Sequence, residues 1–246
     1  MATLTERPRP RPSAERRFYL GMGIVIFLIM FAGFAPSFYL RGMVPPYRPY
    51  LPMSMTVLLH GLLFTGWLAL FVAQASLVSA RRPDIHRRLG LAAFLLLPAM
   101  VAVGFLAALG GVARHSGPPD LSPLTWLAVP LFDIPVFTGL IVAALYKRRD
   151  PQAHKRLMLC ALISLTPPGT GRLPGLQEML TFPVVVVGAQ VLLLAALAIW
   201  DLRSRGRVHP VTIVAGLVIV GSWVLRLAIW QTEGWLAFAG WLSSLA

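Results

Sequence analysis

The sequence predicts an all-α protein that crosses a membrane several times, and three observations lead to this prediction. Hydrophobic residues make up 57% of the 246 residues and charged ones only 13%, whereas a soluble domain is roughly half apolar and a quarter charged. The apolar residues fall into stretches of about 20, the length at which a helix crosses about 30 Å of hydrocarbon. Short basic blocks separate these stretches, as in membrane proteins. We therefore expect a polytopic helix bundle.

The chain divides into a tail rich in Pro and Arg, residues 1–17, and a single transmembrane domain, residues 18–246. The apolar stretch from Phe18 is longer than a signal-peptide core, and no small-residue cleavage pattern follows it, so we expect an uncleaved first span. The irregular piece 167–181 lies between the fifth and sixth spans, and the aromatic stretch 234–246 is expected at the interface. The seven predicted spans are Phe18–Phe38, Met53–Ser79, Leu89–Gly111, Trp126–Tyr146, Pro151–Thr166, Phe182–Trp200 and Val211–Trp230.

The distribution of basic residues predicts the orientation of these spans. The tail and the turns between spans two and three, four and five, and six and seven carry 17 of the Lys and Arg residues, and the other side carries 5. Under the positive-inside rule the N-terminus is cytoplasmic and the C-terminus is outside. The net charge of +13 is therefore attributed to topology, and nucleic acid is not an expected partner.

The two larger cytoplasmic turns, residues 81–90 and 148–157, repeat each other: in each, an Asp precedes a His and a basic pair. We expect Asp84 and Asp150 to cap the helices that follow, with Pro151 at a first helical position. The repeat suggests an internal duplication of a two-helix unit, 53–111 and 126–181. The turns are also expected to bind anionic lipid headgroups. Their candidate site residues are His86, Arg88, His154 and Arg156.

Four ionisable residues lie within or at the edge of the apolar spans. An ionisable group in a bilayer costs at least a few kcal/mol, so each is a candidate functional residue. In the predicted orientation all four fall in the outer half. A regular helix cannot continue past Pro167, and non-helical backbone at this depth must line a cavity or be buried in protein. This predicts an outward-facing ligand pocket whose wall contains His60, Asp133, Arg172 and Arg226.

The second span carries a polar stripe at a spacing of seven residues, formed by His60, Trp67 and Gln74. Residues seven apart are rotated by only about 20° on a helix, so the stripe should face the bundle. Gly61 and Gly66 would let a neighbouring helix or a flat ligand approach. The three stripe residues are the candidate cofactor-binding residues, and haem b is the cofactor considered.

Two interpretations of the polar residues stay open. In the first, Asp133 pairs with Arg226 or Arg172 and His60 donates to a backbone carbonyl, so that these residues only fix helix packing. Alternatively the residues form a ligand, cofactor or ion site. A haem with two histidine ligands needs a second imidazole at the depth of His60, and no other span contains one, although His115 could approach from an outer loop. Because Cys160 is the only cysteine of the sequence, an intrachain disulfide is excluded.

The residues Leu59-His60-Gly61, the turn Asp84-Ile85-His86-Arg87-Arg88-Leu89-Gly90, the turn His154-Lys155-Arg156-Leu157-Met158 and Arg172 together resemble a group of uncharacterised bacterial multi-pass inner-membrane proteins, over Phe18 to Trp200. The two His-basic-basic turns alone also resemble membrane proteins linked to cytochrome oxidase assembly and the spans of b-type cytochrome-like ferric reductases. The resemblance implies a bacterial inner-membrane location and a respiratory complex as partner.

Three functions follow as hypotheses. The first is a non-enzymatic accessory or assembly factor of the respiratory membrane, because no phosphate loop, nucleophile elbow or metalloprotease motif occurs and no catalytic residue is assigned. The second is a haem- or quinone-binding redox protein built on the helix-two stripe. The third is a small-solute transporter, which the duplication favours. The sequence contains no metal-ligand spacing motif that would favour one of these three functions.

Overall fold

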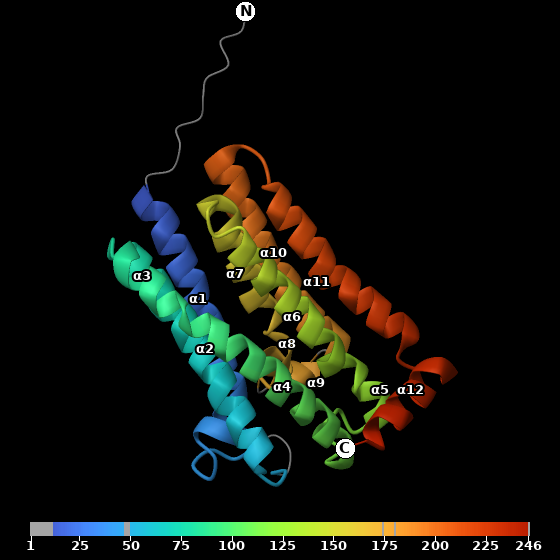
Figure 1. Ribbon diagram of the computed structural model, residues 1–246. Coiled ribbons are helices and arrows are strands. Elements are labelled where there is room, and N and C mark those ends of the chain that lie inside the picture. Colours follow the sequence, from blue (N-terminus) through green and yellow to red (C-terminus); the bar gives the residue numbers. More distant parts are fainter. Residues whose placement is uncertain (1–11, 47–49, 174, 180, 246) are drawn as a thin grey trace, which may run out of the picture.

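The structure is a computed structural model of an all-helical bundle, described over residues 12–46, 50–173, 175–179 and 181–245 (Figure 1). No strand occurs in these ranges, which confirms the predicted all-α class. Its helices are α1 (Pro12–Phe34), which continues as a π-helix (Ala35–Tyr39), α2 (Met55–Ser79), α3 (Pro83–Gly90), α4 (Ala92–Ala113), α5 (Pro123–Trp126), α6 (Ala128–Tyr146), α7 (Pro151–Ser164), α8 (Pro167–Thr170), α9 (Leu176–Met179), α10 (Phe182–Arg205), α11 (Pro210–Ile229) and α12 (Glu233–Ser243).

Six helical segments in the described part of the chain are long and apolar enough to cross a membrane. Each overlaps one of the predicted spans, and together they indicate a multi-pass membrane protein. The segments are Ser13–Tyr39, Met55–Ser79, Pro83–Ala113, Pro123–Tyr146, Val184–Arg205 and Pro210–Ile229.

The predicted fifth span forms a shorter helix, α7. Its 14 residues rise about 21 Å, less than the hydrocarbon thickness of about 30 Å. The helix ends at Ser164, and a separate turn, α8, begins at Pro167. The predicted break is therefore confirmed, because Pro167 and Pro168 have no backbone N–H to continue the helical ladder.

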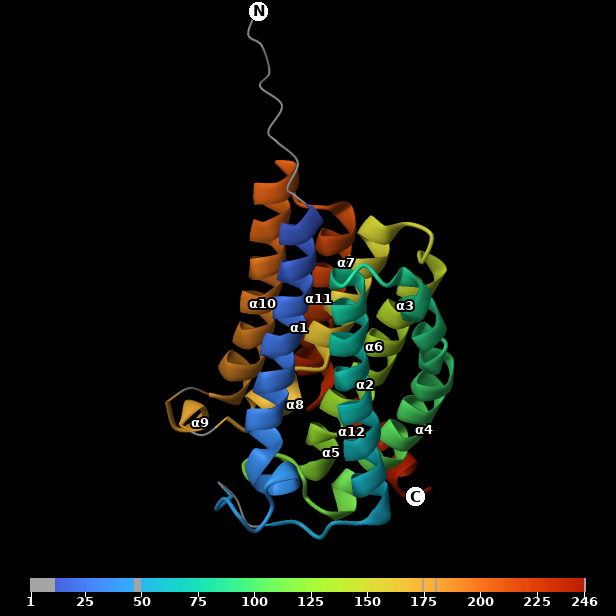
Figure 2. The ribbon, with the colours of Figure 1, turned by 90° about the vertical axis from the view of Figure 1, so that its left-hand side faces the viewer.

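The basic segments lie at one end of the bundle. The start of α1 and the α2–α3, α6–α7 and α10–α11 turns lie toward the upper end in Figures 1 and 2. The π-helix, α5 and α12 lie at the opposite end. The alternation of basic blocks along the sequence thus becomes a charge difference between the two ends, and we call the upper one the basic end.

Helix α7 lies inside the bundle, in contact with α1, α6, α10 and α11. All residues from Leu159 to Ser164 are buried. A helix surrounded by other helices has no lipid-facing side, so α7 need not match the membrane thickness. Asp150 caps it as predicted, its Oδ1 accepting from the backbone N–H of Gln152 at 2.9 Å and of Ala153 at 3.2 Å.

The corresponding prediction for Asp84 is wrong. Helix α3 begins at Pro83, so Asp84 lies inside its first turn and Arg82 stands at the cap position. Proline suits the first helical position because no N–H is needed there, and it starts the helix earlier than the Asp pattern indicated. The Asp84 carboxylate instead binds the exposed guanidinium of Arg82, at 3.1 Å to Nε and 3.0 Å to the terminal nitrogen.

Helix α6 contains both prolines that flank Asp133, and it runs without interruption from Ala128 to Tyr146. Pro130 lies in the first turn, where no intrahelical N–H bond is required, and Pro135 is accommodated in the interior. The aromatic C-terminal stretch forms α12, which packs on α5 and α4. There the Trp235 indole donates to the Leu124 carbonyl at 2.9 Å.

Candidate functional site

Asp133 of α6 and Arg226 of α11 form an ion pair at 2.8 Å. The Arg226 side chain is buried, with 1% exposed, whereas the Asp133 side chain is 21% exposed. The sequence left open whether Asp133 pairs with Arg226 or with Arg172. In the structure Asp133 pairs with Arg226. The pair joins two helices 93 residues apart in the sequence.

Further contacts satisfy the Arg226 guanidinium. It donates to the carbonyl oxygen of Val129 at 3.3 Å and of Ser222 at 3.2 Å, and to the Ser222 hydroxyl at 3.0 Å. It also lies over the Trp223 ring, 4.2 Å from the centroid, a favourable cation–π arrangement. A guanidinium with these partners is held in place, and this favours a packing role.

A second ion pair, between Arg156 of α7 and Asp201 of α10, is completely buried, with both side chains 0% exposed. The Arg156 Nε lies 3.0 Å from Asp201 Oδ1, and a terminal nitrogen contacts the same oxygen. The other terminal nitrogen donates to the carbonyl and side-chain oxygens of Gln152, both at 2.8 Å. Asp201 Oδ2 accepts from the Thr212 hydroxyl at 2.6 Å and the His209 N–H at 3.1 Å. The pair therefore links α7, α10 and the start of α11.

Sequence reasoning missed Asp201 and placed Arg156 among the residues of the basic turn. A signal for Asp201 was present, because a carboxylate near the C-terminus of a helix opposes the helix dipole and needs a cation as partner. Arg88, the residue that corresponds to Arg156 in the first turn, is exposed. The two repeated turns thus place their second basic residue in opposite environments.

Gln190 of α10 closes the buried end of α7. Its amide nitrogen donates to the carbonyls of Ile163 and Ser164, each at 3.2 Å, and its oxygen accepts from the Trp223 indole at 2.7 Å. The last carbonyls of a helix have no intrahelical donor, so a side-chain donor here replaces water that a membrane interior lacks. Gln190 was not among the predicted site residues.

His60 of α2 has a buried Nδ1 atom without a hydrogen-bond partner in the described structure. The predicted bond to a backbone carbonyl is therefore absent at Nδ1. The imidazole stacks on Phe64, with ring centroids 4.2 Å apart. The positive charges of Arg172 and Arg114 act on the imidazole. The Arg172 guanidinium donates to the Pro168 carbonyl at 2.6 Å and lies over the Phe34 ring at 4.8 Å.

The helix-two stripe follows the predicted face, but its members meet different neighbours. Trp67 is 2% exposed and contacts Phe137 edge-on at 5.3 Å. Gln74 has a buried Oε1 without a partner among the described residues. Its amide nitrogen packs near Gly90, 3.3 Å from where a β-carbon would stand. His60 and Gln74 are about 21 Å apart along the helix, so one flat cofactor cannot contact both.

The histidines of the two basic turns interact electrostatically. His154 Nδ1 is 2.8 Å from the Ala144 carbonyl. His86 Nδ1 is buried without a partner in the described residues. The two similar turns thus place both histidines at the basic end, at the other end of α2 from His60.

Two titratable groups at the basic end have shifted pKa values. The backbone N–H groups of Ala153 and Gln152 hold the pKa of Asp150 below its ordinary value. Burial, followed by the charges of Arg156 and Arg205, lowers the pKa of His209. The His209 Nδ1 accepts from the Val211 N–H at 3.1 Å and so caps α11 in its neutral form. Protonation of His209 would remove this cap.

No protein-family model matches the chain, and no curated protein or solved structure shows significant similarity to it. Within the described ranges, no group of three or more His, Cys, Asp or Glu side chains could hold a metal ion. The residue with the clearest capacity for a ligand contact at membrane depth is His60, through its unpartnered Nδ1.

Proposed function

We propose that the chain is a bacterial inner-membrane protein that acts as a non-enzymatic accessory or assembly factor of the respiratory membrane. The observation that carries this proposal is the use of the buried charges. The Arg226–Asp133 and Arg156–Asp201 pairs join helices and are fixed by additional hydrogen bonds. Such pairs specify one arrangement of helices, as a scaffold for a partner protein requires. The respiratory membrane comes from the resemblance of the basic turns to oxidase assembly proteins.

The proposed orientation has the basic end in the cytoplasm, and cysteine labelling tests it. Cys160 is buried and is the only cysteine of the sequence, so it gives little background. Arg149, in the α6–α7 turn, and Ser244, directly after α12, are exposed, and these two segments lie at opposite ends of the bundle (Figure 1). In intact cells, a membrane-impermeant maleimide should label Ser244→Cys and should label Arg149→Cys only after lysis. The opposite pattern would reverse the proposed orientation.

Deletion of the gene in its own host tests the proposed role. Oxygen consumption by the oxidase and the haem bands of dithionite-reduced membranes should fall, while a membrane dehydrogenase that needs no oxidase remains active. Both the wild-type gene and the His60→Ala variant should restore the oxidase, because His60 lies outside the two ion pairs. Unchanged oxidase activity after deletion would refute the respiratory role.

His60 favours a second candidate function, a haem- or quinone-binding redox protein. A buried imidazole nitrogen without a partner in the described structure, on a ring stacked against Phe64, offers a polar contact to a ligand at membrane depth. A quinone carbonyl would accept a hydrogen bond from it, and haem iron would use it as a ligand. For haem, the described residues give His60 no second imidazole inside the bundle at its depth, since His86 and His154 lie at the basic end and His115 is exposed in the loop after α4.

An absorption spectrum of the detergent-purified protein, oxidised and then dithionite-reduced, separates these two functions. A Soret band that shifts on reduction and is lost in His60→Ala, but kept in His115→Ala, would assign haem to His60. His115 lies exposed in a loop and is the matched control. Extraction of a quinone from the wild type, but not from His60→Ala, would assign a quinone. A featureless spectrum without quinone would leave the accessory function.

A further inference from the structure

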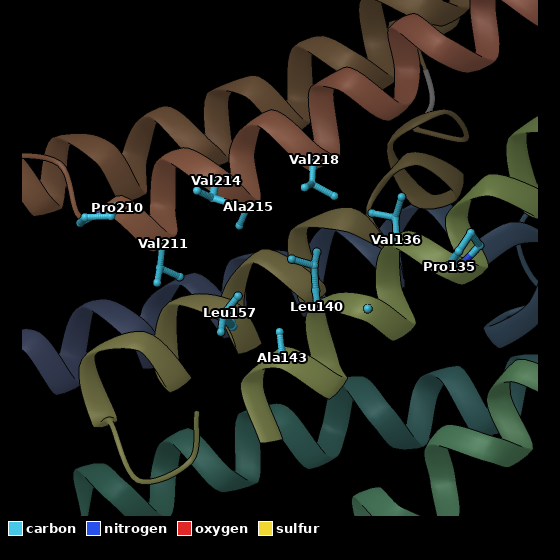
Figure 3. Close-up of a pocket in the computed structure, with 11 residues that line it drawn as sticks. Pro135, Val136, Leu140, Ala143, Leu157, Pro210, Val211, Val214, Ala215 and Val218 are labelled. Atoms are coloured by element: carbon cyan, nitrogen blue, oxygen red, sulfur yellow. The ribbon is translucent and has the colours of Figure 1, made fainter. Parts of the chain in front are cut away.

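An apolar groove of about 430 Å³ runs between α6 and α11, with Leu157 of α7 among its lining residues (Figure 3). Its volume falls in the range of roughly 300–1,000 Å³ that is usual for small-molecule sites. Small residues make room for it: Gly139 and Ala143 on α6 and Ala215 on α11. A β-carbon at Gly139 would meet no atom within 4 Å, so this position is open.

The groove faces the lipid and follows the helix axes. Val214 and Val218 on its rim are 61% and 44% exposed. Its α6 wall extends from Pro135 to Ala143, about 12 Å of helix, which is less than half of the hydrocarbon thickness of about 30 Å. The groove therefore matches the chains of one leaflet. Figure 3 shows that Pro210 and Val211 line one end and Pro135 the other.

The end at Pro210 opens at the basic end of the bundle. The end of α10 and the start of α7 meet here, where Arg205 donates to the Gln152 side-chain oxygen at 3.4 Å. The acidic groups nearby are Asp150, which caps α7, and Asp201, which binds the buried Arg156. The exposed cations outnumber them, so this end of the groove keeps a net positive charge. These cations are Lys147, Arg148 and Arg149 in the α6–α7 turn, Arg203 and Arg205 in the last turn of α10, and Arg207 in the α10–α11 turn that follows.

We propose that this groove and the two turns form a binding site for an anionic phospholipid of the leaflet at the basic end. One acyl chain lies in the groove between α6 and α11, over Leu157, and the phosphate lies between the two turns. The apolar wall recognises the chain, and the cations select a charged headgroup over a zwitterionic one. Clusters of Lys and Arg next to membrane-spanning helices bind anionic lipids in this way.

Native mass spectrometry of the purified full-length protein in a mild detergent tests the site. Phosphatidylglycerol is titrated, and phosphatidylcholine with the same acyl chains serves as the zwitterionic comparison. We expect tighter binding of phosphatidylglycerol. The Gly139→Leu variant fills the groove and should lose this preferential binding. In Arg149→Gln/Arg207→Gln the affinity should fall about 30-fold, since one surface cation contributes roughly a factor of five.

Two matched controls complete the test. Gly188→Leu adds the same side chain to α10, at another glycine with open space around it. Arg16→Gln/Arg17→Gln removes two charges at the basic end, but on α1. Both controls should bind phosphatidylglycerol as the wild type does. Equal affinity for the two lipids, normal binding by Gly139→Leu, an equal loss in the α1 variant, or a dimer that only Gly139→Leu dissociates would each overturn the proposal.

Discussion

Removal of the negative charge in the Arg156–Asp201 pair should strongly destabilise the protein. Asp201→Asn keeps the shape of the side chain but leaves the fully buried Arg156 guanidinium without a counter-charge. Breaking a buried pair by neutralising one partner typically costs about 3–5 kcal/mol. The asparagine amide also cannot accept from both the Thr212 hydroxyl and the His209 N–H while serving Arg156, since one of its two terminal atoms is a donor.

Thermal unfolding in detergent, followed by circular dichroism, measures this cost. For a chain of this size, 1 kcal/mol corresponds to roughly 2–4 °C in Tm, so Asp201→Asn should lower Tm by roughly 6–20 °C. Asp84→Asn is the matched control, because Asp84 pairs with Arg82 at side-chain exposures of 56% and 55%. Water screens such an exposed pair, so its loss should change the stability little. If both variants shift Tm equally little, the argument from burial is refuted.

The double variant Arg156→Met/Asp201→Leu sharpens the same test. Replacement of a whole buried pair by apolar side chains of similar volume is often neutral or stabilising. The double variant should therefore recover most of the stability that Asp201→Asn loses. A double-mutant cycle built from it and the single variants Arg156→Met and Asp201→Leu should show a coupling energy of about 0.5–3 kcal/mol. Additive losses would mean that the two residues act independently, despite their contact.

Two further predictions concern packing and pH. A β-carbon on Gly33 would clash with the Gly169 carbonyl oxygen, so Gly33→Ala should lower the stability by about 1–3 kcal/mol through overpacking. Gly21→Ala, with open space around it, should leave Tm unchanged or higher. Because the folded state lowers the pKa of His209, the stability it contributes is complete above the ordinary value of about 6.5 and is lost as pH falls from there toward the folded pKa. His209→Asn, which keeps an N-cap, should flatten this part of a plot of Tm against pH.

The membrane class and one ion pair could be predicted because each follows from a large energy. Apolar composition at span length leaves little alternative to a helix bundle in lipid. A lone charge at membrane depth is so costly that Asp133 required a partner, and only a few cations lay within reach. Pro167 ended its helix for a local steric reason that needs no tertiary information.

The features that the sequence did not predict depend mainly on contacts between residues that are distant in the sequence or on the exact start of a helix. Arg156 has the same sequence context as Arg88, yet one is buried and the other exposed, because only Arg156 faces a carboxylate 45 residues away. Asp84 and Asp150 lie in similar turns, and the position of the proline relative to each Asp decided which one caps a helix. The role of Gln190 arose only from the broken end of α7, which a linear pattern does not reveal.

The polar groups of the bundle fall into two kinds, and the difference indicates where a ligand should be sought. The charges on α7, α10 and α11 described above have close partners and hold the helices. Six buried polar atoms, by contrast, have no partner in the described structure. Three belong to candidate residues on α2 and α3, namely His60, Gln74 and His86, and the others belong to Tyr19, Thr138 and Trp200. A buried polar atom left unpaired costs about 1–3 kcal/mol. Folding stability gives no reason for unpaired buried atoms on α2. A ligand or partner that supplies the missing hydrogen bonds would remove this free-energy penalty on binding.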